Sequence, residues 1–333
     1  MVAHSYKHSF RFSWVATGST AAYRRQKESC PMTYTVVDAL GRTVRFTYPL
    51  RRLVSLVPSL TEVLCHFGWG PQLVGITDYC TEPAAEVRQK TTVGGTKNPS
   101  LPTVLALQPD LVFAVAEENR RQDVAQLEAA GVPVYVFAPT TVRHGIDVLW
   151  SMATLLDCRT AVATHIETIE HIYTETLALA ATRPRVRVFC PIWKDPYMTI
   201  SDGTYIHDML RVCGGDNIFA QRRRRFPLAA DLGQHTERAG DRYAAYDRRY
   251  PRLALAEMAV LQPEVIVLPD EPYAFGAADV ADFLPFATVP AVRDRRIYCL
   301  DGKIVSWYGT RIGQSLKQLR ALFSLEAGPP TLL

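Results

Sequence analysis

Apolar residues along the chain fall into short continuous runs and longer runs with helical spacing. Residues 53–57 and 186–192 are short apolar runs, and each is followed by a stretch with helical spacing. Continuous short runs are typical of strands buried on both faces of a parallel sheet. The following stretches end at Gly68 and at Gly214, where glycine is expected just beyond a helix. The pattern predicts strand–helix units of the α/β class.

An internal repeat extends this prediction to both halves of the chain. Residues 105–112 return, with conservative changes, as residues 259–266, each around a Gln-Pro pair. A helix is expected to end before each proline, and a β-branched run follows it. With further strands predicted at residues 132–137 and 296–300, each half reads strand–helix–strand–helix–strand. The predicted fold is α/β, with two Rossmann-like lobes that have mostly parallel sheets.

The segment between the two halves is predicted to form one long helix. Residues 146–180 contain neither glycine nor proline and keep apolar residues at helical spacing. Before the first lobe, residues 34–48 alternate around Leu40-Gly41, which predicts a hairpin. The predicted organisation is an extension at 1–31, an N-terminal lobe at 32–142, a linking backbone helix at 143–182 and a C-terminal lobe at 183–327.

Composition is that of a folded globular protein. Of the 333 residues, 48% are apolar and 21% charged, and no apolar run is long enough to span a membrane. The formal net charge is +4, and residues 1–31 carry five basic side chains against one acidic. The remaining chain is therefore neutral, which argues against nucleic acid as a partner.

Residues 1–31 lack the apolar core of a secretory signal, and no lipobox precedes Cys30. We expect a disordered extension or an upstream start with Met32 as the true start; an organelle transit segment is a weaker alternative. As read, the sequence predicts a cytoplasmic protein, and a periplasmic one if the start is wrong. The seven cysteines show no metal-site or CxxC spacing, so we expect no metal site and a reducing compartment.

Candidate ligand-binding residues cluster in loops that follow predicted strands. In open α/β sheets, ligands bind at the carboxyl ends of the strands. Aromatic rings with a polar edge suit a large flat or amphipathic ligand, although each ring could instead pack beneath its own loop. The predicted ligand-binding residues are Tyr79, Thr96, Lys97, Glu118, Asn119, Trp193, Tyr197, Tyr273, Trp307, Tyr308 and Arg311.

Several segments together resemble a known family. They are residues 38–44, 52–62, 93–99, 107–112, 187–189, 214–219 and 307–312. The chain resembles the class III, helical-backbone substrate-binding proteins of ABC transporters, which are receptors for vitamin B12, iron–siderophores and haem. Within that group it is most similar to the cobalamin-binding branch. The resemblance covers roughly residues 33–323 and implies two lobes joined by one long helix, with a ligand held in the cleft.

The resemblance also assigns roles to single positions. Tyr79 falls on an aromatic ligand position, and Trp193 and Tyr197 lie in the loop that supplies another. Arg311 falls near a polar contact to the amide side chains of the corrin. Thr96 and Val115 stand where the B12 pattern has tryptophans.

Two positions bear on a transporter partner. Family members that dock on a permease present one glutamate on each lobe. Pro102 stands at the first of these positions. The second falls at Ala256, one residue before Glu257.

Other residues that could suggest a binding site are better explained by a structural role or by exposure to solvent. A lone His207 is more often structural than a metal ligand. The run Arg222–Arg225 reads as a solvated loop, and residues 221–250 as an insertion over the cleft mouth or a disordered loop.

No hydrolase, zinc-protease, Walker A or dinucleotide motif is present, so we expect a binding protein with no catalytic residues and no covalent cofactor. The working hypothesis is a monomeric binding protein for a cobalamin-type corrinoid, serving ABC uptake or intracellular salvage. An iron–siderophore or haem binding protein is the alternative of the same class. An enzyme acting on a bound metallocofactor is the alternative of another class.

Overall fold

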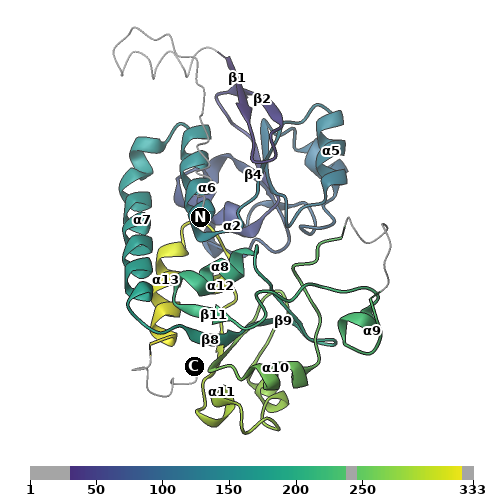
Figure 1. The fold of residues 1–333 in the computed structure, drawn as a ribbon. Helices are drawn as coiled ribbons and strands as arrows, with labels where there is room; N and C mark the ends of the chain where they lie inside the picture. The colour runs from purple at the N-terminus through teal and green to yellow at the C-terminus, as the bar shows by residue number, and fades with distance from the viewer. Residues whose placement is uncertain (1–30, 238–245, 325–333) are drawn as a thin grey trace. The chain divides into compact units, whose positions relative to one another are not determined.

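The computed structural model describes residues 31–237 and 246–324 (Figure 1). The predicted extension at 1–31 lies almost wholly outside these residues. The chain divides into two compact units, with the boundary between Ala138 and Pro139. Within the described part, every helix is too short or too polar to cross a membrane.

The first unit is built on a five-stranded sheet in which all strands are parallel. In spatial order the strands are β5 (Thr91–Thr92), β4 (Leu73–Ile76), β3 (Leu53–Ser55), β6 (Leu111–Val115) and β7 (Val134–Phe137). Strands β3, β6 and β7 are buried along their whole length, which explains why the sequence there is continuously apolar. The helices are α2 (Pro58–His66), η1 (Gly70–Gln72), α3 (Ala84–Val87), α4 (Leu101–Ala106) and α5 (Arg121–Ala129).

A hairpin precedes this sheet, as predicted. It pairs β1 (Met32–Val37) with β2 (Thr43–Tyr48), and Gly41 in its turn has φ +75°. The carboxylate of the buried Asp38 accepts hydrogen bonds from the backbone N–H groups of Leu40 and Arg42 at 2.9 and 3.0 Å. Arg42 also donates to the carbonyl of Val134 at 3.1 Å, so the turn is fastened to β7.

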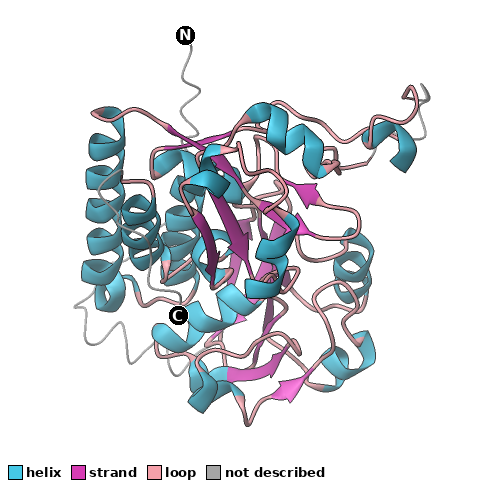
Figure 2. Ribbon diagram, turned by 90° about the horizontal axis from the view of Figure 1, so that it is seen from below, coloured by secondary structure: helices cyan, strands magenta, loops and turns pink. Residues whose placement is uncertain are grey.

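The second unit contains a four-stranded parallel sheet and a small antiparallel pair. Figure 2 shows the strands of the protein in magenta and the helices in cyan. In spatial order the parallel strands are β11 (Gly215–Asn217), β8 (Val186–Phe189), β12 (Val265–Pro269) and β13 (Ile297–Leu300). The antiparallel pair is β9 (Pro191–Trp193) with β10 (Met198–Thr199). The helices are α6 (Val142–Leu155), α7 (Arg159–Ala181), α8 (Tyr205–Val212), α9 (Leu228–Asp231), α10 (Leu255–Leu261), η3 (Ala277–Asp282), α11 (Pro290–Arg293), α12 (Lys303–Ser306) and α13 (Ile312–Leu322). The prediction of an α/β fold with two mostly parallel sheets is confirmed.

The single helix expected at 143–182 forms two helices, α6 and α7. Asp157 takes a left-handed φ of 54°, and the N–H of Cys158 returns to the carbonyl of Ala153 at 2.9 Å. This is a Schellman ending, which glycine usually makes and which aspartate tolerates. The absence of glycine and proline therefore did not guarantee a continuous helix. Both helices pack within the second unit, and α13 (yellow) runs beside α7 (teal) in Figure 1.

The sequence repeat marks the same junction in both units. Gln108 and Gln262 end α4 and α10 with left-handed φ values of 45° and 49°, and β6 and β12 follow. In the first unit Arg52 donates from Nε to the carbonyl of Leu107 at 2.6 Å, and its backbone N–H donates to Asp110 at 2.8 Å.

Arg187 makes the equivalent bonds in the second unit. It donates from Nε to the carbonyl of Leu261 at 3.2 Å, and its backbone N–H donates to Glu264 at 2.8 Å. We call this arrangement the amino-edge junction.

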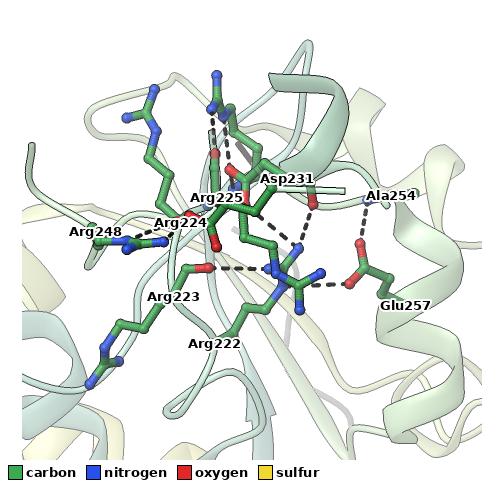
Figure 3. A network of polar contacts seen from close by, with 10 residues as sticks. Arg222, Arg223, Arg224, Arg225, Asp231, Arg248, Ala254 and Glu257 are labelled. Carbon is green, nitrogen blue, oxygen red and sulfur yellow. Dashed lines mark hydrogen bonds and ion pairs between the residues drawn. The ribbon is translucent and has the colours of Figure 1, made fainter. Parts of the chain in front are cut away.

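The arginine-rich segment after β11 folds around one buried carboxylate (Figure 3). Asp231 is fully buried and accepts hydrogen bonds from the backbone N–H groups of Arg225 and Arg252, both at 2.9 Å. Arg252 also donates to it from Nε at 3.0 Å, and Arg222 lies 3.6 Å from its other oxygen. The expectation of a solvated run at Arg222–Arg225 was wrong for Arg222, which is 13% exposed. Asp231 thus supplies the counter-charge for Arg222 and Arg252.

We predict that Asp231→Ala destabilises the second unit by about 3–5 kcal/mol, because it leaves buried arginines and two backbone donors without an acceptor. Thermal or urea unfolding measures the loss. Glu237→Ala, which removes an exposed ion pair to Arg248, is the matched control and should cost below about 1 kcal/mol. Equal losses for the two variants would contradict the central role of Asp231.

Candidate ligand-binding loops

In the first unit, Asn119 ties together the loops at the carboxyl edge of the sheet. Its Oδ1 accepts from the backbone N–H of Val115, at the end of β6, at 2.8 Å. Its Nδ2 donates to the carbonyls of Leu56 and Thr96 at 3.1 and 3.0 Å. Asn119 is 6% exposed. We interpret it as the residue that positions the loops, while the predicted contact to ligand stays a prediction.

The loop after β4 presents Tyr79 to solvent. The ring is 63% exposed and rests on Gly95, where a Cβ atom would lie 3.3 Å from the tyrosine Cε2. The next residue, Cys80, is buried, with Sγ 3.1 Å from the hydroxyls of both Thr61 and Thr77. Burial raises the pKa of the Cys80 thiol, so it stays protonated and packs as a small apolar group. The loop is therefore anchored by Cys80 and exposes Tyr79.

The other predicted residues of the first unit lie beside this loop. Lys97 is exposed and donates from Nζ to the carbonyl of Glu117 at 2.5 Å. Thr96 and Glu118 are half-buried, and the charge of Glu118 contributes to the raised pKa of Cys80. The five predicted residues of this unit thus come together at one edge of the sheet.

In the second unit, aromatic rings form a row that leads from the surface into the core at the carboxyl ends of β8 and β12. Trp193 is 44% exposed and meets Tyr273 edge to face, with ring centroids 5.9 Å apart. Tyr273 contacts Phe275 at 4.6 Å, and Tyr197 stacks on Phe275 at 6.2 Å. Tyr197 also packs on the buried Phe283. Trp193 is the exposed end of this row, and Tyr197 is its attachment to the core.

Lys194 holds this aromatic row in place. Its Nζ lies 2.7 Å from carboxylate oxygens of both Asp279 and Asp282 in η3. The hydroxyl of Tyr197 donates to Asp282 at 2.6 Å, and burial together with that bond raises the pKa of Tyr197. The hydrogen bond from Lys194 is the main reason that both carboxyls have a pKa below their ordinary value of 3.8. The loop carrying Trp193 is thereby fixed to η3.

Trp307 and Tyr308 lie in the core, at 7% and 5% exposure. The Nε1 of Trp307 donates to Glu271 at 3.1 Å, and Tyr308 meets Tyr205 edge to face at 5.6 Å. The guanidinium of Arg311 lies 5.4 Å from the Trp307 ring. Burial favours a packing role for the two rings over the predicted ligand contact, because their faces are already covered. Trp307 still supports the loop that carries Tyr273, through Glu271.

The sequence reasoning missed the residues that position the site. Lys194 lies between Trp193 and Tyr197 in a predicted loop, but its partners lie 85 and 88 residues further on, and no local pattern links them. His207 is tied to Asn217, with Nδ1 3.3 Å from the amide nitrogen, and burial lowers its pKa. Within the described residues, no group of His, Cys, Asp and Glu is arranged to hold a metal ion.

We predict that Lys194→Met destabilises the protein at pH 7 by about 1–2 kcal/mol, because two charge-assisted hydrogen bonds are lost and two carboxylates are left facing each other. Asp279 and Asp282 have lowered pKa values when folded, so their stabilising effect is present above pH 3.8 and is lost as the pH falls through the folded values.

Melting temperatures measured from pH 7 down to about pH 2.5 should therefore converge for the wild type and Lys194→Met. Lys317→Met, which removes an exposed lysine on α13, is the control and should follow the wild type at every pH. A gap for Lys194→Met that stays constant across the range would rule out the ion pairs as its cause.

Comparison with known proteins identifies the family and the relatives that this chain resembles. The periplasmic binding protein family matches residues 53–304. The vitamin B12-binding protein of Salmonella typhimurium is 30% identical over 182 residues, which cover 54% of this chain and 66% of that protein. The first curated relatives are covered over 62% to 66% of their length, so the chain spans less than two thirds of them.

Solved structures share the fold. The periplasmic heme-binding protein of Roseiflexus sp. RS-1 superposes with a TM-score of 0.66 at 22% identity, covering 82% of this chain and 97% of that one. The periplasmic vitamin B12 binding protein of Vibrio cholerae gives 0.65 at 20% identity, covering 83% and 97%. At these identities the likeness establishes the fold alone.

The family match extends from the first residue of β3 into α12 and so includes both parallel sheets. The family consists of binding proteins, which confirms the expectation of a binding protein rather than an enzyme. This chain belongs to the periplasmic binding protein family.

Proposed function

We propose that this protein binds one corrinoid of the cobalamin type through the aromatic loops at the carboxyl edges of its two sheets. The observation that carries the proposal is the exposure of large rings at these edges. Trp193 is 44% exposed and braced by Tyr273, and Tyr79 is 63% exposed above Gly95. Rings held in place before binding lose little freedom when they meet a broad, partly apolar ligand.

The chemistry of the loops supports a ligand that brings its own chelated metal. The described residues offer no cluster of metal-binding side chains, whereas the exposed faces of Tyr79 and Trp193 suit a broad ring system. The curated relatives named as vitamin B12-binding proteins point to the same ligand class. Haem and iron–siderophores are the competing ligands.

We further propose that the loaded protein serves uptake through an ABC permease. Membership in the periplasmic binding protein family supports this role. Neither position expected to carry a docking glutamate supplies a free carboxylate. Pro102 is exposed on α4, and Glu257 accepts from the N–H of Ala254 at 3.3 Å and lies 3.7 Å from Arg222. Intracellular salvage of a corrinoid remains the other role that the same binding activity would serve.

Titration with cyanocobalamin tests the ligand. Calorimetry and the visible spectrum of the eluted complex should give one ligand per chain, with the corrinoid recovered unaltered. Parallel titrations with haemin and with a ferric siderophore complete the experiment. Binding of either of these without binding of cyanocobalamin would overturn the corrinoid assignment.

We predict that Trp193→Ala weakens cyanocobalamin binding about thirtyfold, which corresponds to about 2 kcal/mol for an aromatic anchor. Its effect on stability should be small, because the ring is half exposed and leaves no closed cavity. Trp307→Ala is the matched variant with the opposite expectation, a loss of about 3–5 kcal/mol of stability from the buried position.

Tyr79→Ala tests whether the first unit contributes to the same ligand. If one corrinoid uses both sets of loops, this variant should also lose affinity while its melting temperature stays close to that of the wild type. A strongly destabilised Trp193→Ala with wild-type affinity would remove the second unit from the site.

A further inference from the structure

A cavity of about 290 Å³ lies in the second unit, at the opposite edge of the sheet from the aromatic loops. Its walls come from the last turns of α7 and α13 and from the turns that lead into β8 and β11. These are the amino ends of the two strands, whereas Trp193 and Tyr273 follow carboxyl ends. The cavity is therefore separate from the proposed corrinoid site, and the inference drawn from it does not rest on that proposal.

Two arginines give the cavity its charge. Arg183 and Arg320 line it, and no acidic residue does. Among residues 31–237 and 246–324, neither arginine has a carboxylate within ion-pair distance. The Nη1 atom of Arg320 is buried and has no hydrogen-bond partner in the described part of the chain. Two guanidinium groups of like charge without a counter-charge among the described walls favour an anion beside them.

The end of α13 does not account for Arg320. A basic residue in the last turn is favoured by the helix dipole, which explains why arginine is tolerated there. However, the carbonyl of Leu322 is already capped by Arg296, which donates from Nη2 at 3.1 Å. The hydroxyl of Ser324 likewise donates to the carbonyl of Ala321 at 2.8 Å. Other groups thus cap these two carbonyls, and no described residue bonds to Nη1 of Arg320.

Part of the wall is apolar. Leu179, Pro184 and Phe323 line the cavity together with the two arginines. The Phe323 ring also fills the space over Gly215, where a Cβ atom would lie 3.1 Å from the ring. A guanidinium pairs with a carboxylate through two parallel hydrogen bonds, and an apolar body would cover the other walls.

We propose that this cavity is a binding site for a small organic carboxylate with an apolar body, held by Arg320 and Arg183.

Calorimetry of the full-length protein with benzoate as the probe tests the site. Benzoate should bind in the presence of excess chloride, and more tightly than acetate or inorganic phosphate. Arg320→Met should lower the affinity for benzoate at least tenfold, since charge-assisted hydrogen bonds are lost while the volume of the side chain is nearly kept. Arg183→Met should lower it as well.

Lys317→Met removes the same charge from an exposed position of α13 and is the matched control, expected to bind benzoate like the wild type. Absence of benzoate binding to the wild type, an equal loss in Lys317→Met, or an affinity for phosphate equal to that for benzoate would each overturn the assignment. Melting temperatures of the variants without benzoate establish that each one is folded.

Discussion

Both parallel sheets depend on the amino-edge junction, in which one arginine joins the start of the first strand to the end of a helix. Arg52 and Arg187 donate to the carbonyls of Leu107 and Leu261, each of which directly precedes a left-handed glutamine. The following acid accepts from the backbone N–H of the same arginine, so strand and helix are bound twice. Since this fixes the relative height of neighbouring strands at one edge, it also determines where their opposite ends emerge, and it is at those ends that the loops of the proposed site begin.

At the carboxyl edges of their sheets, the two units hold their loops in place with different polar groups. The first unit holds three loops with one buried amide, Asn119, and exposes Tyr79 beside it. The second unit holds its loop with an ion-pair cluster around Lys194 and exposes Trp193. In each case a buried or paired polar group orders the loop in the folded protein, so that ligand binding does not have to offset this loss of conformational entropy. The exposed ring is then left with both rigidity and an open face, which is the combination that broad flat ligands require.

The sequence predicted those secondary-structure elements that produce a local apolar pattern or a repeat. Continuous apolar runs predicted the buried parallel strands, and the repeated Gln-Pro pairs predicted the helix end and the following strand in both units. The arginines of the amino-edge junction were not predicted, because they lie far from these pairs in the sequence. The break at Asp157 escaped prediction, because a left-handed aspartate leaves no signature in apolar spacing. The packing of Trp307 and Tyr308 in the core was not predicted, for a related reason. Loop position alone does not distinguish an exposed ring from one covered by residues far away in the chain, as Tyr308 is by Tyr205. The long-range polar partners of Lys194, Asp279 and Asp282, could not be predicted from any local pattern.

The distribution of charge separates structural arginines from those that await a ligand. Arg222 and Arg252 share the buried Asp231, and Arg42 shares Asp38, so in these places the chain supplies its own counter-charge. Such pairing is what permits a charged group to be buried at all. Arg320 breaks this rule, because it buries a donor beside a cavity whose described walls contain no acid. Arg224 likewise has a buried Nε without a partner, but the charges of Asp231 and Asp247 act on its guanidinium, so Arg320 is distinguished by the acid-free described walls of its cavity. The counter-charge that the described walls lack is the one that the proposed carboxylate would supply, and the volume of the cavity limits it to a small molecule.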